Sequence, residues 1–213
     1  MSNRKGNQKC GYVAIVGPTN AGKSTLLNAI LGKKLSIVSR KVQTTRTRIQ
    51  AILTKEDVQL ILIDTPGIFN PKRFKDRSYI KEAISSLEHS DIIVYMVEAN
   101  KGFDRDAYLS LNKMIGAQQI VIIINKIDLP SADIPTVTQD LVDFLGVTED
   151  DIIEVSAKTG TGVDKILDKV ITDTPPPNES KDEYSKAFII DSWFDNYLGV
   201  VVLVKVISGS INP

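Results

Sequence analysis

Residues 17–25 carry the residue types that bind the phosphate groups of a nucleotide. They read Gly-Pro-Thr-Asn-Ala-Gly-Lys-Ser-Thr and match the P-loop pattern G-x-x-x-x-G-K-[ST]. Gly17 and Gly22 let the backbone wrap closely around a polyphosphate and turn its N–H groups inward, at the positive end of the following helix. We expect Lys23 to reach the β- and γ-phosphates and the Ser24 hydroxyl to be a ligand of Mg²⁺.

Three further motifs follow in the order expected of a guanine-nucleotide site. Asp64-Thr65-Pro66-Gly67 fits D-x-x-G, Asn125-Lys126-Ile127-Asp128 fits N-K-x-D, and Ser156-Ala157-Lys158 comes later. The Asp128 carboxylate would accept two hydrogen bonds from the N1–H and exocyclic amine of guanine, which adenine cannot offer. We expect Lys126 to lay its aliphatic stem along the base and the amides of 156–158 to meet guanine O6. The pattern therefore predicts selection of GTP over ATP.

The elements around the motifs predict how they are positioned. The apolar run Tyr12–Val16 predicts a strand before the P-loop, and Leu26–Leu31 predicts a helix that Gly32 ends. Alternating strands and helices imply a mainly parallel sheet with helices on both faces, where ligands bind beyond the carboxyl ends of the strands. The motifs would follow the first, third, fifth and sixth strands. We expect further strands at 49–54, 58–63, 91–98, 119–124 and 151–155, helices at 77–87, 104–114, 137–145 and 162–171, and a loop at 34–48.

The composition is typical of an ordinary soluble domain with a small appendage. Of 213 residues, 42% are hydrophobic, and 26 Lys and Arg balance 26 Asp and Glu, so no global charge favours nucleic acid or membrane. The single cysteine, Cys10, excludes an internal disulfide. No apolar run approaches the roughly 20 residues of a membrane span. We expect a cytoplasmic protein, with a peripheral position at the inner membrane as the alternative.

A proline-rich segment predicts the domain boundary. Residues 174–180 read Thr-Pro-Pro-Pro-Asn-Glu-Ser, a stiff linker, and two strands with no helix between them follow at 187–191 and 199–208. Two strands are too few to be stable alone, so they pack on the first domain or belong to something larger. We predict a flexible N-terminus (1–9), a GTP-binding domain (10–173), a linker (174–184) and a partial β-barrel-like segment (185–213).

The motifs resemble those of two GTPase families. Residues 11–125 resemble the Era GTPases, on Gly17–Ser24, on Lys41-Val42-Gln43-Thr44-Thr45-Arg46 and on Asp64–Ile68. From about Asn125 to the end the chain is similar to LepA, also called elongation factor 4. The matching segments there are Asn125–Asp133, Ser156–Gly160, Pro175-Pro176-Pro177 and Asp191–Val200. The combination suggests a hybrid with its junction near residues 125–128, a motif that both families share.

The Era resemblance implies roles for residues outside the P-loop. It implies that Thr45 or its neighbour Thr44 closes over the γ-phosphate and Mg²⁺, that Asp64 holds Mg²⁺ through a water, and that the Gly67 amide senses the γ-phosphate. Ile68 stands where Ras-like and translational GTPases have Gln or His to orient the attacking water, so intrinsic turnover should be slow. Asn20 matches an asparagine that can help to bind K⁺ in related families.

The predicted site residues fall into three groups. The catalytic group is Lys23, Thr45 and Gly67. The metal group is Ser24, Thr45, Thr44 and Asp64. The nucleotide-binding group is Gly17, Asn20, Ala21, Gly22, Lys23, Ser24, Thr25, Asp64, Thr65, Pro66, Gly67, Asn125, Lys126, Asp128, Ser156, Ala157 and Lys158.

The sequence thus predicts an α/β P-loop NTPase, a Ras-like G domain, followed by a truncated β segment. Its predicted activity is Mg²⁺-dependent hydrolysis of GTP to GDP and phosphate, with K⁺ as a second cation. The resemblances imply that its partner is the ribosome or ribosomal RNA. Nothing after Ile171, however, resembles the KH-type RNA-binding domain of Era proteins. Two alternatives stay open: a GTP-binding switch with negligible hydrolysis, and an inactive hybrid or truncated product whose halves do not pack together.

Overall fold

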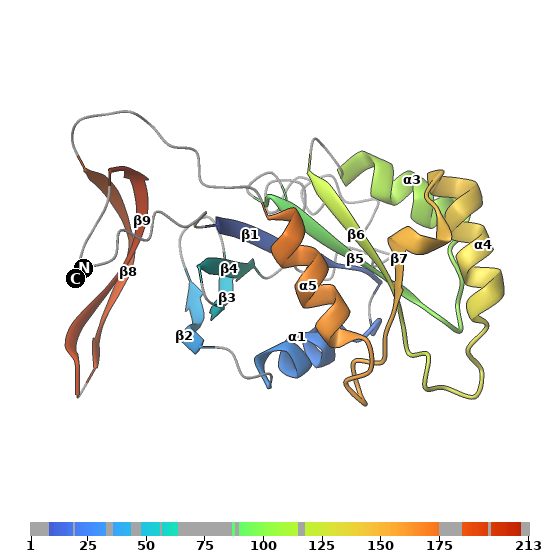
Figure 1. The fold of residues 1–213 in the computed structure, drawn as a ribbon, viewed down its shortest axis with the longest axis horizontal. Helices are drawn as coiled ribbons and strands as arrows, with labels where there is room; N and C mark the ends of the chain where they lie inside the picture. The colour runs from blue at the N-terminus through green and yellow to red at the C-terminus, as the bar shows by residue number, and fades with distance from the viewer. Residues whose placement is uncertain are drawn as a thin grey trace.

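A seven-stranded sheet forms the centre of the first domain (Figure 1). The computed structural model describes residues 9–18, 20–32, 36–43, 48–55, 57–63, 87, 90–114, 118–174, 185–195 and 197–209. The strand order is β2-β3-β4-β1-β5-β6-β7. Strands β4, β1, β5, β6 and β7 are parallel, while β3 is antiparallel to both β2 and β4. The strands are β1 Lys9–Val16, β2 Ser36–Gln43, β3 Arg48–Lys55, β4 Val58–Ile63, β5 Ile92–Glu98, β6 Gln119–Asn125 and β7 Ile152–Glu154.

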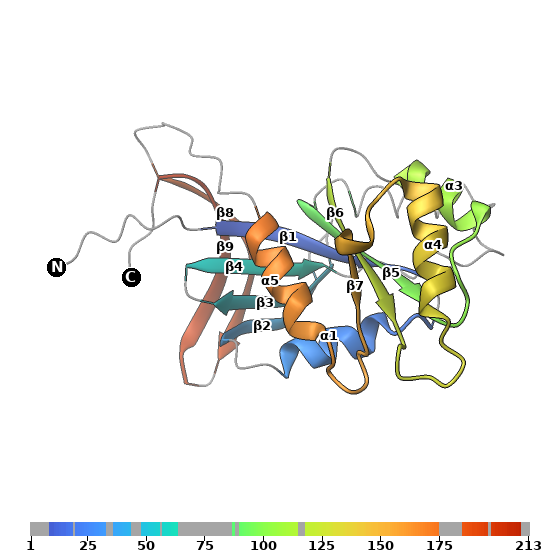
Figure 2. The same cartoon turned by 45° about the vertical axis from the view of Figure 1, so that its right-hand side comes forward.

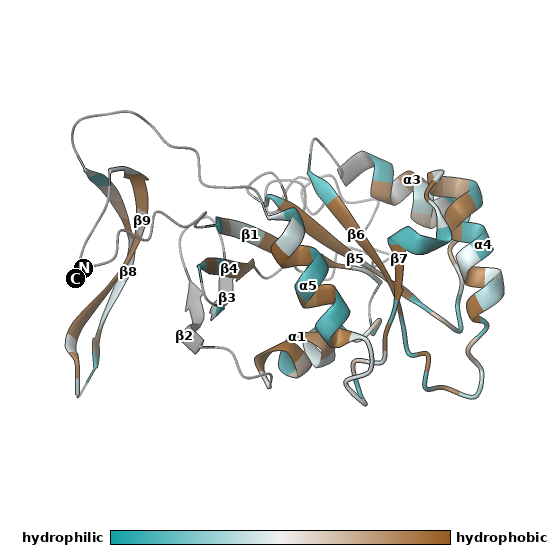
Figure 3. Ribbon diagram, in the orientation of Figure 1, coloured by the Kyte–Doolittle hydropathy of each residue, from teal (hydrophilic) through white to brown (hydrophobic). Residues whose placement is uncertain are grey.

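Helices cover both faces of this sheet, as the sequence predicts. Helices α1 (Lys23–Leu31) and α5 (Val163–Asp173) lie side by side on one face, and α3 (Arg105–Met114) and α4 (Ile134–Leu145) cover the other (Figure 2). Every residue of β5 is buried, because this central strand has a helical layer on each side. Figure 3 shows the resulting apolar character of the central strands. The predicted α/β fold class is confirmed.

The prediction of a loop at 34–48 is wrong, because β2 occupies Ser36–Gln43. This strand lies at the edge of the sheet and pairs only with β3. Its sequence, Ser-Ile-Val-Ser-Arg-Lys-Val-Gln, has the charges common on edge strands and not the apolar run of a buried strand. With β2 added, the N-K-x-D and Ser-Ala-Lys motifs follow the sixth and seventh strands. The predicted helix at 77–87 lies outside the described residues except for Leu87.

Strands β8 (Lys186–Asp195) and β9 (Gly199–Ser208) form a separate antiparallel hairpin. It stands beside the end of the first domain where β1 begins (Figure 1). In the turn, Asp195 Oδ1 accepts hydrogen bonds from the backbone N–H groups of Tyr197 (2.8 Å) and Leu198 (3.0 Å). Leu203 packs against the core on the α3–α4 side of the sheet. The hairpin that the sequence predicts is present, with a longer first strand, while the domain boundaries stay predictions.

Within the described ranges, no helix is long and apolar enough to cross a lipid bilayer. This finding covers α1, α3, α4 and α5, the longest of which is α4 with 12 residues.

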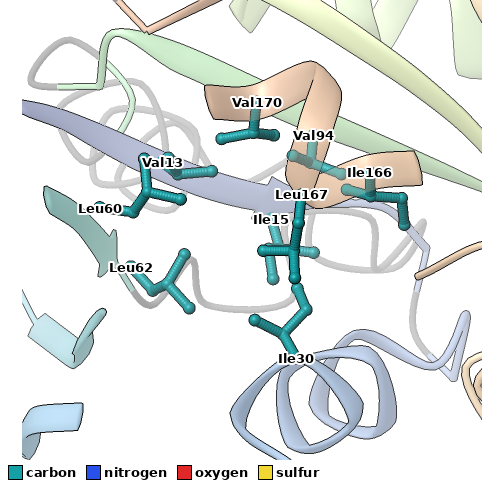
Figure 4. Close-up of a pocket in the computed structure, with 9 residues that line it drawn as sticks. All are labelled: Val13, Ile15, Ile30, Leu60, Leu62, Val94, Ile166, Leu167 and Val170. Atoms are coloured by element: carbon teal, nitrogen blue, oxygen red, sulfur yellow. The ribbon is translucent and has the colours of Figure 1, made fainter. Parts of the chain in front are cut away.

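A small apolar cavity lies between the sheet and helices α1 and α5 (Figure 4). Its volume is about 10 Å³, room for about one water molecule, but the lining offers no polar partner, so the cavity stays dry. The lining residues are Val13, Ile15, Ile30, Leu60, Leu62, Val94, Ile166, Leu167 and Val170.

The Leu167→Ala substitution should enlarge this cavity and lower the free energy of unfolding by about 3 kcal/mol. Leu167 is buried against the sheet from α5, so truncation removes contacts that the neighbouring side chains cannot restore. Urea denaturation measures the change. The control is Leu109→Ala on α3, where the side chain is 43% exposed and the loss should stay below about 1 kcal/mol. Equal losses for the two variants would contradict this account of the core.

Candidate functional site

The P-loop connects β1 to α1 and presents the start of the helix. Asn20 and Gly22 have left-handed backbone conformations, with φ of 67° and 100°. Gly22 caps α1 without a side chain, and the first turn of the helix contains no acidic residue. The positive end of α1 therefore faces the loop without a carboxylate of its own to neutralise it.

Lys23 is the first residue of α1, and its side chain turns back over the loop. Its Nζ donates hydrogen bonds to the carbonyl oxygens of Gly17 (2.9 Å) and Pro18 (2.7 Å). Gly17 lies against β5, where an added Cβ would come within 2.6 Å of the Met96 carbonyl oxygen. The loop thus requires glycine at this position because the backbone approaches a strand closely.

Asn125 joins two of the predicted loops. Its side chain is buried at the end of β6, where Nδ2 donates to the carbonyl oxygen of Ala21 (2.7 Å). Its Oδ1 accepts a hydrogen bond from the backbone N–H of Ala157 (3.0 Å). One amide therefore fixes the P-loop and the loop after β7 relative to each other. The two loops are 136 positions apart when counted from Ala21 to Ala157, so the fold alone brings them together.

Asp128 is held by the loop after β7. The Ser156 hydroxyl donates a 2.7 Å hydrogen bond to Asp128 Oδ1 and accepts one from the backbone N–H of Thr159 at 3.1 Å. Ser156 is buried, whereas Asp128 is exposed to solvent. A buried hydroxyl thus orients an accessible carboxylate, which is the arrangement that recognition of a polar base edge needs.

Glu98 lies against the candidate site, in contact with Lys126, and no sequence motif includes it. It ends β5, its side chain is 1% exposed, and its carboxylate contacts the ammonium groups of Lys101 and Lys126. Burial opposes ionisation of this group, but the hydrogen bonds and charges of the two lysines outweigh it and hold the pKa of Glu98 below its ordinary value. The sequence does contain a signal for Glu98. It is a carboxylate directly after the apolar run 92–97, in the strand that comes before the one with N-K-x-D.

The structure brings part of the predicted site together at the carboxyl ends of β1, β6 and β7. The residues placed there are Gly17, Asn20, Ala21, Gly22, Lys23, Ser24, Thr25, Asn125, Lys126, Asp128, Ser156, Ala157 and Lys158. Thr44, Thr45, Asp64, Thr65, Pro66, Gly67 and Ile68 lie outside the described residues, and their roles stay predictions.

The hydroxyl of Ser24 is suited to be a ligand of Mg²⁺. Ser24 lies exposed in the first turn of α1, next to Lys23. Mg²⁺ keeps several waters and binds through few protein oxygens together with substrate phosphates, so a single hydroxyl here suits it. No group of three or more His, Cys, Asp or Glu side chains able to hold a metal occurs in the part of the chain that the structure describes.

The fold and these loops define a P-loop G domain. The P-loop follows the first strand, the sheet is parallel except at its β2–β3 end, and N-K-x-D begins at the last residue of β6. The chain belongs to the family described as 50S ribosome-binding GTPases, whose model matches residues 12–126.

Known relatives and structures agree with this class. The GTPase Era of Bradyrhizobium sp. (strain BTAi1) is 38% identical over 174 residues, which are 79% of this chain and 54% of that protein. An alignment of this length extends past residues 11–125, so the Era likeness does not end at the predicted junction. The chain spans about half the length of the curated relatives it matches.

Two solved structures of Era have the same fold as this chain. Era of Aquifex aeolicus bound to GDP and AlF₄⁻ is 27% identical, with a TM-score of 0.62 over 93% of this chain and 78% of that one. Era in complex with MgGDPNP and nucleotides 1506–1542 of 16S ribosomal RNA gives the same identity, TM-score and coverage.

Proposed function

We propose that this chain is an Era-like GTPase that binds GTP and hydrolyses it to GDP and phosphate. The observation that carries the proposal is the Asn125 side chain, which joins the P-loop at Ala21 to the loop at Ala157. This bridge supports a single site with phosphate-binding groups at one end and base-binding groups at the other. The Era relatives and the Era structures with GDP and MgGDPNP support the same activity.

At the phosphate end, we propose that the chain acts by positioning and by charge. Lys23 exchanges its contacts with the Gly17 and Pro18 carbonyls for the β- and γ-phosphates, and the N–H groups at the start of α1 bind phosphate oxygens. Ser24, with Thr45 or Thr44 and Asp64, would hold Mg²⁺. When bound, the ion neutralises charge on the phosphates. Water then attacks the γ-phosphorus in line, the bond from this phosphorus to the β–γ bridging oxygen breaks, and GDP and phosphate are released. The Gly67 amide would sense the γ-phosphate.

At the base end, Asp128 would accept hydrogen bonds from the N1–H and amine of guanine. Ser156 keeps the carboxylate in place through its 2.7 Å hydrogen bond. Lys126 would lie along the base, and the amide of Lys158 would meet O6. The amides of Ser156 and Ala157, which the motif also suggests for O6, already donate to the Thr161 carbonyl and to Asn125 Oδ1. These roles follow from the motif pattern and are consistent with the contacts of the described residues.

A second candidate function is a GTP-binding switch with negligible hydrolysis. Ile68 favours it, because an aliphatic side chain cannot hydrogen-bond to the attacking water.

If the chain does hydrolyse GTP, we propose that K⁺ compensates for the missing polar group at position 68. It would bind near Asn20, an exposed P-loop residue with a left-handed backbone. A cation there would act on the phosphates in place of an arginine finger.

Single-turnover hydrolysis of GTP separates the two candidates. With Mg²⁺, the chain should hydrolyse GTP faster in KCl than in NaCl, by about 100-fold, the effect of one group that stabilises charge in the transition state. The Asn20→Ala variant should lose this difference between the two salts. In the Lys23→Met variant, GTP should be hydrolysed no faster than in buffer without protein. Rates at the uncatalysed level in both salts, with GTP still bound, would support the switch instead.

We also propose a ribosomal partner and a LepA-like C-terminal part. The Era complex with 16S ribosomal RNA suggests that small-subunit RNA is the partner. The LepA likeness rests on the segment Asp191-Ser192-Trp193-Phe194-Asp195-Asn196-Tyr197-Leu198-Gly199-Val200, whose described residues include the end of β8 and the start of β9. Cytoplasmic location is part of the same proposal. Co-sedimentation with small ribosomal subunits, stronger with a GTP analogue than with GDP, would test the partner.

A further inference from the structure

Glu98 makes an ion pair with a residue of the base-recognition motif. Its carboxylate, at the carboxyl end of β5, contacts the ammonium groups of Lys126 on the neighbouring strand end and of Lys101 at 2.7 Å. The Lys126 side chain is 27% exposed and that of Lys101 is 58% exposed. Because Lys126 is better shielded from water, the carboxylate constrains it more strongly than it constrains Lys101.

Lys126 also has an unusual backbone. Its φ of 69° lies in the left-handed region, and among the described non-glycine residues only Asn20 of the P-loop shares this property. Such a conformation persists where the surroundings determine it. Here Ile127 N–H donates to the Val155 carbonyl (3.3 Å) and Ala99 N–H to the Asn125 carbonyl (2.8 Å), so both flanks of Lys126 are tied to neighbouring elements.

Stability alone does not explain a buried carboxylate at this place. A buried ion pair gains little over apolar side chains of the same volume, because two charges must leave water. An ion pair does fix where a long side chain lies. With its ammonium tied to Glu98 and its backbone tied on both flanks, the stem of Lys126 has little freedom to move.

We propose that Glu98 is a positioning residue that holds the stem of Lys126 in place to stack on a guanine base. The inference rests on the proposed guanine-nucleotide site and adds a residue to it. Glu98 touches no nucleotide in this account and acts only through Lys126. Its lowered pKa keeps the carboxylate charged at neutral pH, where the pair is needed. Without the ion pair to Glu98, the Lys126 side chain would lose conformational freedom when the base binds, and this loss would lower the affinity for the nucleotide.

The test is a double-mutant cycle read out by the dissociation constant for fluorescent GDP. Glu98→Gln keeps the side-chain volume and removes the charge, and it should weaken GDP binding by about tenfold, the size of one charge-assisted hydrogen bond. Lys101→Gln removes the other partner of Glu98 and should change the affinity less than about twofold. In a Lys126→Met background, Glu98→Gln should cause no further loss.

Three outcomes would overturn the inference. They are unchanged GDP affinity in Glu98→Gln, an equal loss with and without Lys126, and a loss in Lys101→Gln as large as in Glu98→Gln. Circular dichroism checks that each variant folds. If Glu98→Gln does not fold, Glu98→Asp, which keeps the charge but shortens the side chain, replaces it in the same cycle. Failure of the wild type to bind GDP would instead refute the proposed function.

Discussion

The Asp128→Asn variant should lose GDP affinity by at least about 100-fold and gain affinity for xanthosine diphosphate. The wild-type carboxylate accepts hydrogen bonds from the N1–H and the exocyclic amine of guanine. An asparagine NH₂ group at the same place opposes the guanine amine but can donate to the carbonyl that xanthine has there. The Ser156 hydroxyl holds the side chain and is itself held by the Thr159 N–H, so the substitution changes the chemistry of the side chain more than its position.

Competition against fluorescent GDP and xanthosine diphosphate measures both changes. The matched control is Asp133→Asn, the same substitution at the exposed N-cap of α4, where the side chain accepts a 3.3 Å hydrogen bond from Thr136 N–H. Asparagine is an equally good N-cap, so the control should bind GDP like the wild type. Loss of GDP binding without a gain for xanthine would show that Asp128 supports the loop and does not read the base.

The Gly22→Ala variant should bind GDP at least about 100-fold more weakly than the wild type. The φ of 100° at this position costs any other residue about 1–2 kcal/mol. An added Cβ would also lie 2.5 Å from Asn125 Nδ2, which donates to the Ala21 carbonyl. Moving Asn125 leaves buried polar groups unpaired, which costs about 1–3 kcal/mol more. The substitution would therefore both strain the P-loop and break the hydrogen bonds through which Asn125 joins the P-loop to the loop after β7.

Gly146→Ala separates these two causes. Gly146 ends α4 with a φ of 67°, and no heavy atom lies within 4 Å of the position of an added Cβ. This variant has the backbone cost alone, about 1–2 kcal/mol in unfolding free energy, and should bind GDP normally. Isothermal titration with GDP and thermal unfolding of both variants give the comparison. Wild-type affinity in Gly22→Ala would show that Asn125 does not need its present position for binding.

The strands and helices with strong apolar patterns could be predicted from the sequence, and the polar ones could not. Strands β5 and β6 are continuous apolar runs, and their positions follow directly from the residues. Strand β2 was missed because it pairs on one side only and has few apolar residues. Its existence depends on β3 offering an edge, which is a tertiary contact that local sequence does not contain.

The candidate site shows the same division. The motifs identify Lys23, Asn125 and Asp128 because their spacing is characteristic. They do not indicate that the Asn125 side chain bridges Ala21 and Ala157, since the two contacts join residues 104 and 32 positions away from it. Glu98 belongs to no motif, and its significance depends on burial and on its distance from Lys126.

We propose that the P-loop and the loops after β6 and β7 form one guanine-nucleotide site, joined through Asn125. Displacement of fluorescent GDP from the purified chain by GTP and by ATP, with Mg²⁺ present, tests this directly. We expect displacement by GTP and none by ATP at the same concentration. Equal displacement by ATP, or no GDP binding by the folded chain, would contradict it.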